Sequence, residues 1–145
     1  MQLRLQTSVN QPPERVWIGF DERLFRALSP PFPPVEIVRF DGCQAGDVVH
    51  LRLNFLLFRQ DWISYITAQK TTTEEIYFVD EGRKLPFFLR YWHHRHRLIR
   101  QGSRTLIVDD ISYRTPTLLT DWLFYPLLWA QFAYRGPVYK RYFGS

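Results

Sequence analysis

The sequence has one cysteine, Cys43, and no apolar run long enough to cross a membrane. A single cysteine forms no intramolecular disulfide, so the chain is expected to suit a reducing compartment. Residues 2–7 alternate apolar and polar side chains and lack the apolar core of a signal peptide, which predicts a cytoplasmic location. The C-terminal apolar stretch is shorter than the ~20 residues of a membrane span, and Asp121 and Gln131 interrupt it.

The sequence also lacks the usual motifs of phosphate and nucleic-acid recognition. Gly42 and Gly46 are not followed by the Lys-Ser/Thr pair of a P-loop. The net charge is +5, but the basic residues are spread along the chain and accompany no recognition-helix or zinc-finger pattern. We therefore expect a solvated basic face and no nucleic acid partner. Cys43 adjoins a predicted turn and is expected to be incidental rather than nucleophilic.

What the sequence does contain suits one domain, residues 1–145. A chain of 145 residues buries roughly two thirds of its unfolded surface, so it needs neither a disulfide nor a metal ion to fold. Aromatic residues make up 17% of the chain. Such side chains either line an apolar binding site or fill the core of a β-rich domain, and composition leaves both open.

Two stretches have helical spacing. Apolar residues recur from Val16 to Leu28, after Pro13 and Glu14, which predicts one or two short helices interrupted near Gly19. A proline-rich segment then prevents the helix from continuing.

Residues 118–143 predict a long C-terminal helix that packs on a sheet. Thr117 or Thr120 can cap its start. Pro126 should kink this helix, and residues 136–137, a Gly-Pro pair, can break it again.

Between the two helical regions the chain predicts strands joined by short turns, which implies an antiparallel meander. The predicted strands are residues 3–7, 35–40, 48–58, 61–70, 73–80, 87–100 and 105–114, with residues 81–84 as a turn. Leu53, Phe55 and Leu57 share one face of the third of these strands. Together the patterns predict an α+β fold: a curved antiparallel sheet of six to seven strands, two short helices, and a long C-terminal helix.

Several local patterns accompany this order. Residues 12–17 read PPERVW, residues 85–96 join LPF to WHHRH, residues 109–116 read DDISYRTP, and residues 132–135 read FAYR. Over nearly the whole chain these features resemble the START-like helix-grip superfamily, also called SRPBCC, with its polyketide cyclase/dehydrase and coenzyme Q-binding relatives. The resemblance implies a hydrophobic ligand held between sheet and long helix. It names neither the ligand nor a reaction, because this fold hosts many functions.

The last predicted hairpin carries polar residues on the face that should point inward. If its turn centres on residues 102–103, three cross-strand pairs follow: Trp92 with Tyr113, His94 with Ile111, and His96 with Asp109. Strand alternation puts these six residues on one mostly apolar face, and the opposite face is charged.

Three interpretations of the inner polar residues stand side by side. In the first, His96 and Asp109 satisfy each other and Tyr113 bonds the backbone, because buried polar groups need partners. In the second, these groups orient a carbonyl or hydroxyl of a ligand in an apolar pocket. In the third, His94 or His96, oriented by Asp109, acts as a general acid or base, as a cyclase or dehydratase requires.

The two histidines could also reach one metal ion, with Asp109 as the third ligand. Arg95 and Arg97 lie alongside them, however, and an HxH pair on a strand does not by itself define a metal site. The sequence therefore predicts no metal and no cofactor.

These observations favour a cytoplasmic protein that binds a small, largely hydrophobic molecule between the sheet and the C-terminal helix. The candidate ligand-binding residues are Leu53, Phe55, Trp92, His94, His96, Asp109, Tyr113, Trp122 and Trp129. One alternative is a cyclase- or dehydratase-like enzyme that uses His94, His96 and Asp109. Another is an interaction module at a membrane surface or on a protein partner. It predicts an exposed apolar patch beside the basic residues Arg135, Lys140 and Arg141.

Overall fold

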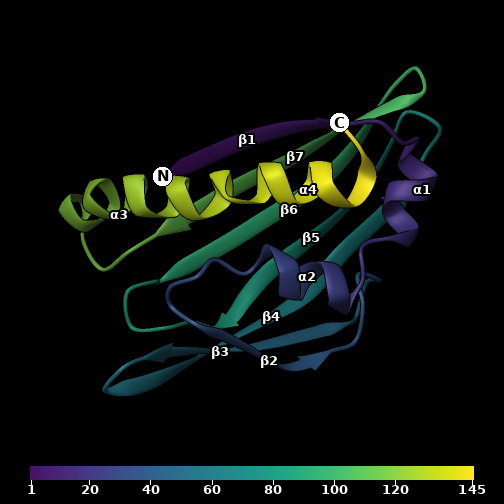
Figure 1. The fold of residues 1–145 in the computed structure, drawn as a ribbon. Helices are drawn as coiled ribbons and strands as arrows, with labels where there is room; N and C mark the ends of the chain where they lie inside the picture. Colours follow the sequence, from purple (N-terminus) through teal and green to yellow (C-terminus); the bar gives the residue numbers. More distant parts are fainter.

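One curved sheet of seven strands dominates the computed structural model, which describes all residues from Met1 to Ser145. The strands are β1 (Gln2–Val9), β2 (Val35–Phe40), β3 (Val48–Phe55), β4 (Phe58–Thr71), β5 (Glu75–Lys84), β6 (Tyr91–Gln101) and β7 (Arg104–Arg114). Their order across the sheet is β1-β7-β6-β5-β4-β3-β2, and every neighbouring pair is antiparallel. The predicted meander is therefore confirmed from β2 to β7, and β1 adds to its far edge (Figure 1).

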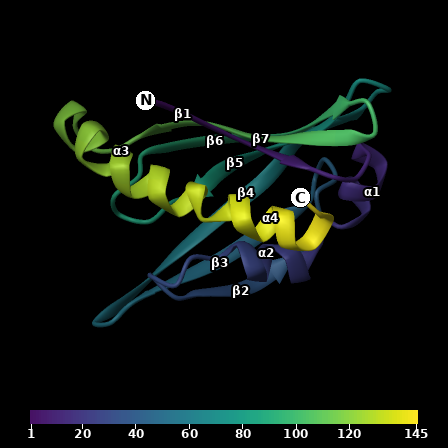
Figure 2. The same cartoon turned by 45° about the horizontal axis from the view of Figure 1, so that its top comes forward.

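Four helices lie on one side of this sheet. They are α1 (Pro13–Ile18), α2 (Glu22–Leu28), α3 (Leu118–Ala133) and α4 (Arg135–Phe143). In Figures 1 and 2 the sheet curves around them, and α3 and α4 run one after the other along its concave face. The chain thus has the predicted α+β helix-grip fold. None of its helices is long and apolar enough to cross a membrane.

Side-chain caps set the starts of two helices. The backbone N–H of Leu24 donates to the Asp21 carboxylate at 2.9 Å at the start of α2. At the start of α3, the N–H of Thr120 donates to the Thr117 hydroxyl, and the N–H of Thr117 donates to the Thr120 hydroxyl, each at 3.1 Å. Such caps satisfy backbone donors that have no partner within the helix. The predicted cap at Thr117 is confirmed.

The C-terminal helical region divides at Tyr134, two residues before the predicted break at Gly136 and Pro137. Pro126 lies inside α3, and the helix continues past it. The chain leaves α3 at Tyr134 and begins α4 at Arg135, so Gly136 and Pro137 fall in the first turn of α4. A proline is tolerated there because the first backbone N–H groups of a helix have no intrahelical partner.

The predicted turn at residues 81–84 is wrong, because β5 continues to Lys84. The turn was predicted because of Gly82, since glycine often marks a turn. In the structure it lies beside a bulge between β4 and β5. A side chain at this position would clash with Leu85 and lie 3.2 Å from the Cβ of Trp92. The glycine therefore permits close packing within the sheet.

The strand predicted over residues 48–58 divides into two. Phe55 of β3 pairs with Phe58 of β4, and the chain reverses direction between them. Leu56 and Leu57 are consequently 92% and 97% exposed, so Leu57 does not share the inner face with Leu53.

Two apolar clusters fill the space between sheet and helices. The larger, beneath α1, α2 and α4, contains Val9, Val16, Phe20, Leu24, Leu28, Cys43, Ile66, Ile76, Phe78, Leu98, Ile107, Val138, Tyr139 and Phe143. The smaller, beneath α3, contains Leu3, Leu89, Trp92, Ile111, Tyr113, Leu128 and Phe132. Cys43 is one of the buried apolar residues, and burial raises the pKa of its thiol, which makes it a poor nucleophile.

Candidate functional site

A cavity of about 680 Å³ lies between the inner face of the sheet, α2, the loop after α2, and α3. Of its 34 lining residues, 23 are hydrophobic, which suits a pocket for an apolar small molecule. Three lining residues, Phe32, Phe87 and Leu127, are 60%, 59% and 60% exposed. The cavity therefore reaches the molecular surface between the α2–β2 loop, the β5–β6 loop and α3.

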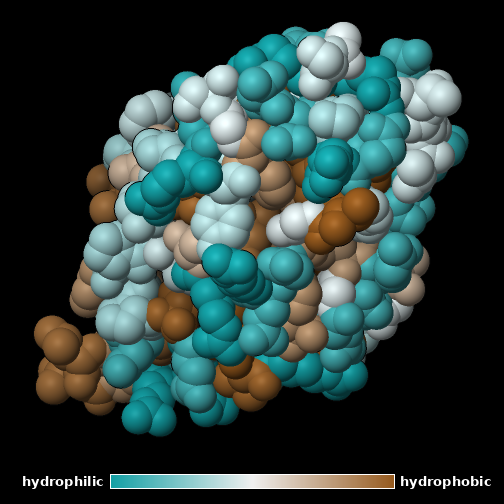
Figure 3. Space-filling model, turned by 45° about the vertical axis from the view of Figure 1, so that its right-hand side comes forward, coloured by the Kyte–Doolittle hydropathy of each residue, from teal (hydrophilic) through white to brown (hydrophobic).

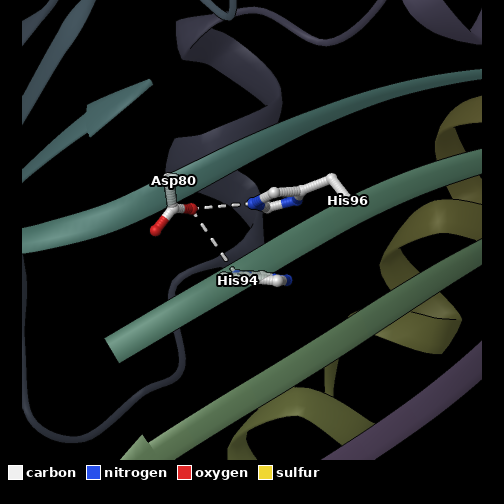
Figure 4. Close-up of side chains that lie close together, drawn as sticks. All are labelled: Asp80, His94 and His96. Carbon is white, nitrogen blue, oxygen red and sulfur yellow. Dashed lines mark hydrogen bonds and ion pairs between the residues drawn. The ribbon is translucent and has the colours of Figure 1, made fainter. Parts of the chain in front are cut away.

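The polar part of the cavity wall comes from two adjacent strands. Asp80 on β5, and His94 and His96 on β6, line the cavity together (Figure 4). The predicted register of the last hairpin is confirmed: Trp92 pairs with Tyr113, His94 with Ile111, and His96 with Asp109. On the other side of β6, Asp80 pairs with His94. One central strand thus presents two imidazoles between the carboxylates of its two neighbours.

The hydrogen bonds run diagonally rather than straight across. His94 Nε2 donates to Asp109 Oδ1 at 2.9 Å, and His96 Nε2 donates to Asp80 Oδ2 at 2.8 Å. The straight-across contacts are longer, at 3.6 Å from His94 Nδ1 to Asp80 Oδ2 and 3.7 Å from His96 Nδ1 to Asp109 Oδ1. The expected hydrogen bond between His96 and Asp109 is therefore wrong. Side chains two residues along a neighbouring strand are still within reach of a long side chain, and here they are the better partners.

Asp80 is a site residue that the sequence interpretation placed at a strand end. Since β5 runs on to Lys84, Asp80 lies within the strand and continues the inward alternation of Ile76 and Phe78. Its second oxygen, Oδ1, accepts a hydrogen bond from the Trp92 indole at 3.1 Å. The alternation of Ile76, Phe78 and Asp80 is the signal that could have identified it.

Arg135 is the second residue misplaced from sequence, where it was expected on a basic surface. Its side chain is 16% exposed and reaches inward to Asp109, with Nη1 at 3.3 Å from Oδ1. The Tyr139 hydroxyl donates to the other oxygen of Asp109 at 3.4 Å. Arg135 also lies over the Phe132 ring, at 4.5 Å from its centroid. No local pattern in the sequence reveals these contacts, because they depend on how α4 packs against the sheet.

Both carboxylates stay ionised in this buried cluster. Burial by itself would raise the pKa of Asp109, but the Arg135 guanidinium and the hydrogen bond from His94 outweigh it and hold that pKa well below its usual range. Burial also opposes ionisation of Asp80, and the hydrogen bond from His96 and the neighbouring imidazoles nevertheless lower the pKa of this carboxyl. Ionised carboxylates only accept hydrogen bonds, so the Nε2 atoms of both histidines carry the hydrogens.

His96 is neutral at neutral pH. Burial lowers its pKa to about 4, and repulsion from His94 adds to this, against the opposing attraction of Asp80. Its ring is stacked on Phe78, with centroids 4.1 Å apart. Its Nδ1 has no hydrogen-bond partner although the side chain is only 2% exposed. A buried polar atom without a partner is costly, and Asp109 Oδ1, 3.7 Å away, is beyond hydrogen-bonding distance of Nδ1.

The structure divides the nine candidate ligand-binding residues into two groups. Those that line the cavity are Leu53, Phe55, Trp92, His94 and His96. Asp109 lies behind His94 and does not reach the cavity. Tyr113 is buried away from the cavity, and its hydroxyl donates to the backbone carbonyl of Asp121 at 2.8 Å. It anchors α3 to the sheet.

Trp122 and Trp129 were expected on the cavity wall, and this expectation is wrong. They are seven residues apart on the same face of α3, and they are 69% and 49% exposed. Leu128 and Phe132 face inward instead, at 3% and 9% exposure. Because α3 is apolar on nearly all sides, periodicity alone does not show which side meets the sheet.

The outward side of α3 therefore carries an exposed apolar patch. It is formed by Leu118, Leu119, Trp122, Leu123, Leu127 and Trp129, each at least 49% exposed. Leu56 and Leu57, between β3 and β4, are exposed as well. Figure 3 shows hydrophobic atoms gathered at one corner of the molecular surface, the lower left of this view. Contiguous exposed apolar surface of this kind often marks an interaction site.

No family model matches the sequence, and no curated protein matches it. Several solved structures share its fold. Norcoclaurine synthase from Thalictrum flavum, in complex with dopamine and hydroxybenzaldehyde, superposes with a TM-score of 0.68 over 98% of this chain and 85% of its own, at 11% identity. The Zhui aromatase/cyclase from Streptomyces sp. R1128 gives 0.60 over 98% and 95%, at 16% identity.

A START superfamily protein from Mycobacterium smegmatis gives a TM-score of 0.61 over 97% of this chain and 98% of its own, at 13% identity. These likenesses extend over essentially the whole chain. The START-like helix-grip architecture inferred from the sequence is thus confirmed as a fold, and identities this low carry no function with them.

Proposed function

We propose that this protein binds a small, largely hydrophobic molecule in the cavity between the sheet and α3. The observation that carries the proposal is the cavity of about 680 Å³, with its mostly hydrophobic wall and one polar region made by Asp80, His94 and His96. Apolar walls supply affinity, and a few placed polar groups orient the ligand. The expected ligand is therefore an apolar body with one polar group.

The comparisons support this use of the cavity by analogy. One structural neighbour is a complex with dopamine and hydroxybenzaldehyde, so a protein of this fold binds small aromatic molecules, and another neighbour is an aromatase/cyclase. Within this chain, Leu53, Phe55 and Trp92 are the apolar wall residues that we assign to ligand contact, and His94 and His96 are the polar ones. We place the protein in the cytoplasm, in keeping with its single cysteine.

Native mass spectrometry of freshly purified protein, paired with the same sample denatured, tests the proposal directly. A reproducible extra mass that disappears on denaturation is the expected result, and it reveals the class of the ligand. Saturable binding of the fluorescent probe 1-anilinonaphthalene-8-sulfonate gives a second measure of whether the cavity takes up an apolar molecule.

A cavity-filling variant sharpens the test. Leu53→Trp adds volume to the inner wall and should weaken saturable binding of the fluorescent probe at least tenfold. Leu56→Ala at the exposed hairpin tip is the matched control and should bind as the unmodified chain does. Equal probe binding by Leu53→Trp, with its fold intact by circular dichroism, would contradict the proposal.

A cyclase- or dehydratase-like activity is the second candidate function, and the neutral His96 on the cavity wall, held by the Asp80 carboxylate, favours it. His96 with Asp80 behind it has the form of an oriented general base. His94 suits this role less well, because both its nitrogens face carboxylates, at 2.9 Å and 3.6 Å. The sequence suggested Asp109 as the carboxylate that orients the catalytic histidine. In the structure it hydrogen-bonds to His94 and not to His96.

An elimination assay tests the enzyme hypothesis. A β-hydroxy aryl thioester loses its α-proton to the base and its hydroxyl as water, which leaves an absorbing conjugated thioester. Turnover by the unmodified protein that His96→Gln abolishes is the expected result for an enzyme. Turnover that is absent, or unchanged in His96→Gln, would exclude His96 as the base for this reaction.

Contact with a membrane surface is a third candidate function, favoured by the exposed apolar patch on α3. Lys140 and Arg141 on α4 are exposed, whereas Arg135 is turned inward and does not flank the patch. Co-sedimentation with vesicles of phosphatidylglycerol tests this function. Binding that weakens with salt and with loss of Trp122 would support it, and no sedimentation at low salt would exclude it.

A further inference from the structure

Three potential metal ligands converge at the polar end of the cavity. Asp80, His94 and His96 each offer one ligand atom, and these atoms all lie within 4.8 Å of one another. Asp80 Oδ2 is 2.8 Å from His96 Nε2 and 3.6 Å from His94 Nδ1. Bonds of about 2.0–2.1 Å in tetrahedral geometry separate ligand atoms by about 3.3–3.4 Å. The two distances lie on either side of that value, so small side-chain adjustments would complete the site.

We infer that Asp80, His94 and His96 form a binding site for a divalent transition-metal ion at the polar end of the cavity. Two imidazoles supply borderline nitrogen donors and the carboxylate supplies a hard oxygen donor, a mixed set that suits Zn²⁺ or Fe²⁺ better than Mg²⁺ or Ca²⁺, which prefer oxygen ligands alone. The inference needs no organic ligand in the cavity, and it therefore stands apart from the proposed function.

The first support is an arrangement of two acceptors that face each other. His94 donates its Nε2–H to Asp109 at 2.9 Å, so in the neutral imidazole, the form that binds a metal, Nδ1 carries the lone pair. That lone pair faces Asp80 Oδ2 at 3.6 Å, and Oδ2 is itself an acceptor. Two acceptors turned toward one point in a buried setting repel each other unless a cation lies between them. Figure 4 shows both imidazoles directed at the same oxygen of Asp80.

The second support is the unpartnered nitrogen of His96. When Nε2 holds the proton for Asp80, Nδ1 is buried with no partner. A metal ion bound at Nε2 would move the proton to Nδ1. That nitrogen points toward Asp109 Oδ1, 3.7 Å away, and a small ring rotation would bring them to hydrogen-bonding distance. Metal binding would thus satisfy the atom that the metal-free cluster leaves unpaired.

The third support is the shell of groups around the ligands. Histidine ligands usually donate their second N–H to a carboxylate, and Asp109 already receives this bond from His94. Trp92 donates to Asp80 Oδ1 at 3.1 Å, so Oδ2 is the oxygen that faces the two histidines. Arg135 and Tyr139 also bind Asp109, which does not line the cavity. Asp109 therefore supports the ligand His94 and does not itself bind the ion. The third ligand is Asp80 and not Asp109, the residue that the sequence suggested.

Charge and access agree with a cation at this point. With neutral imidazoles, two ionised carboxylates and one Arg135 leave the buried cluster with a net negative charge. All three proposed ligands line the cavity. Any further coordination position therefore faces the ligand space, as it does in metal sites with three protein ligands and one open position. A polar or anionic group of a molecule in the cavity would reach the ion directly.

Titration of metal-free protein with Zn²⁺ or Co²⁺ alone tests the inference. After chelator treatment, the protein should bind one equivalent in competition with a chromophoric chelator. Asp80→Asn and His96→Gln should weaken binding at least 100-fold, and Asp109→Asn should weaken it about 10- to 100-fold. His93→Gln removes a histidine from the opposite face of the same strand, and it should bind as the unmodified protein does.

X-ray absorption spectroscopy of the Zn²⁺-loaded, unmodified protein identifies the metal ligands directly. It therefore tests the inference even if one of the variants does not fold. It should show two imidazole ligands and oxygen donors at about 2.0–2.1 Å. The inference is overturned if the protein binds no stoichiometric Zn²⁺ or Co²⁺. It is equally overturned if folded Asp80→Asn binds normally, or if binding disappears in His50→Gln, which alters a surface His50–Asp61 pair instead. Neither result bears on fluorescent-probe binding, so this inference and the proposed function fail separately.

Discussion

His94 and His96 stack on each other, with ring centroids 3.6 Å apart and planes inclined by 26°. The two rings lie between Asp80 on one neighbouring strand and Asp109 on the other, and each ring donates one hydrogen bond to a different carboxylate. This arrangement links the whole cluster, because a proton or ion gained by one ring changes the field at the other.

Stability of the metal-free protein should fall as the pH is lowered from about 6.5 to about 4. The folded chain lowers the pKa of His96 to about 4, against 6.5 in the unfolded chain. Between pH 6.5 and 4, His96 is therefore protonated in the unfolded chain but stays neutral in the folded chain. A difference of about 2.5 pKa units corresponds to about 3 kcal/mol of unfolding free energy. Urea denaturation at a series of pH values measures it.

His96→Gln should remove this loss of stability, and His93→Gln should retain it. The titratable groups that act on His96 are His94, Asp80 and Asp109. The two carboxyls have lowered pKa values, so their own stabilising effect disappears only below about pH 4. An unfolding free energy that is flat between pH 6.5 and 4 would contradict the burial of a neutral His96.

Asp109→Ala should destabilise the fold by about 3–5 kcal/mol. It removes the main ionic partner of the buried Arg135, which would then be an uncompensated charge. Asp109→Leu combined with Arg135→Met removes both charges, and it should cost clearly less than Asp109→Ala alone. A double-mutant cycle of chemical denaturation curves provides the measurement. Additive effects of the two substitutions would show that the pair is not coupled.

Tyr113→Phe should cost about 1–2 kcal/mol of stability and leave binding of the fluorescent probe unchanged. The substitution removes the hydroxyl that donates to the Asp121 carbonyl at 2.8 Å, so that carbonyl loses a buried donor. Probe affinity should be unaffected, because Tyr113 does not line the cavity. Thermal denaturation and a probe titration of the same samples check both parts. A large loss of affinity would place Tyr113 in the binding site after all.

Trp122→Ser should leave the melting temperature nearly unchanged, whereas Leu128→Ala on the same helix should cost about 2–5 kcal/mol. Trp122 is 69% exposed and Leu128 only 3%, so only the second removes core contacts. Circular dichroism melts of the two variants make the comparison. Destabilisation by Trp122→Ser as large as that by Leu128→Ala would mean that α3 presents a different side to the sheet.

Rules that depend only on residues close together in the sequence predicted most of the fold. The predicted strand at residues 35–40 has the bounds of β2, and the register of the last hairpin follows from its turn. Strand alternation places His94 and His96 on the inner face because successive side chains point to opposite sides. The cap at Thr117 was likewise within reach, since capping depends on neighbouring residues alone.

The composition of the site depended on tertiary structure. Asp80 and Arg135 join the two histidines from β5 and α4, so distant segments must pack before the cluster exists. The orientation of α3 was decided in the same way. Its apolar residues surround the whole helix, and only packing against the curved sheet selects Leu128 and Phe132 for the interior and leaves Trp122 outside. The sequence by itself therefore determined which strand faces point inward, because that periodicity is local. The partners that meet there were decided only by the assembled sheet and helices.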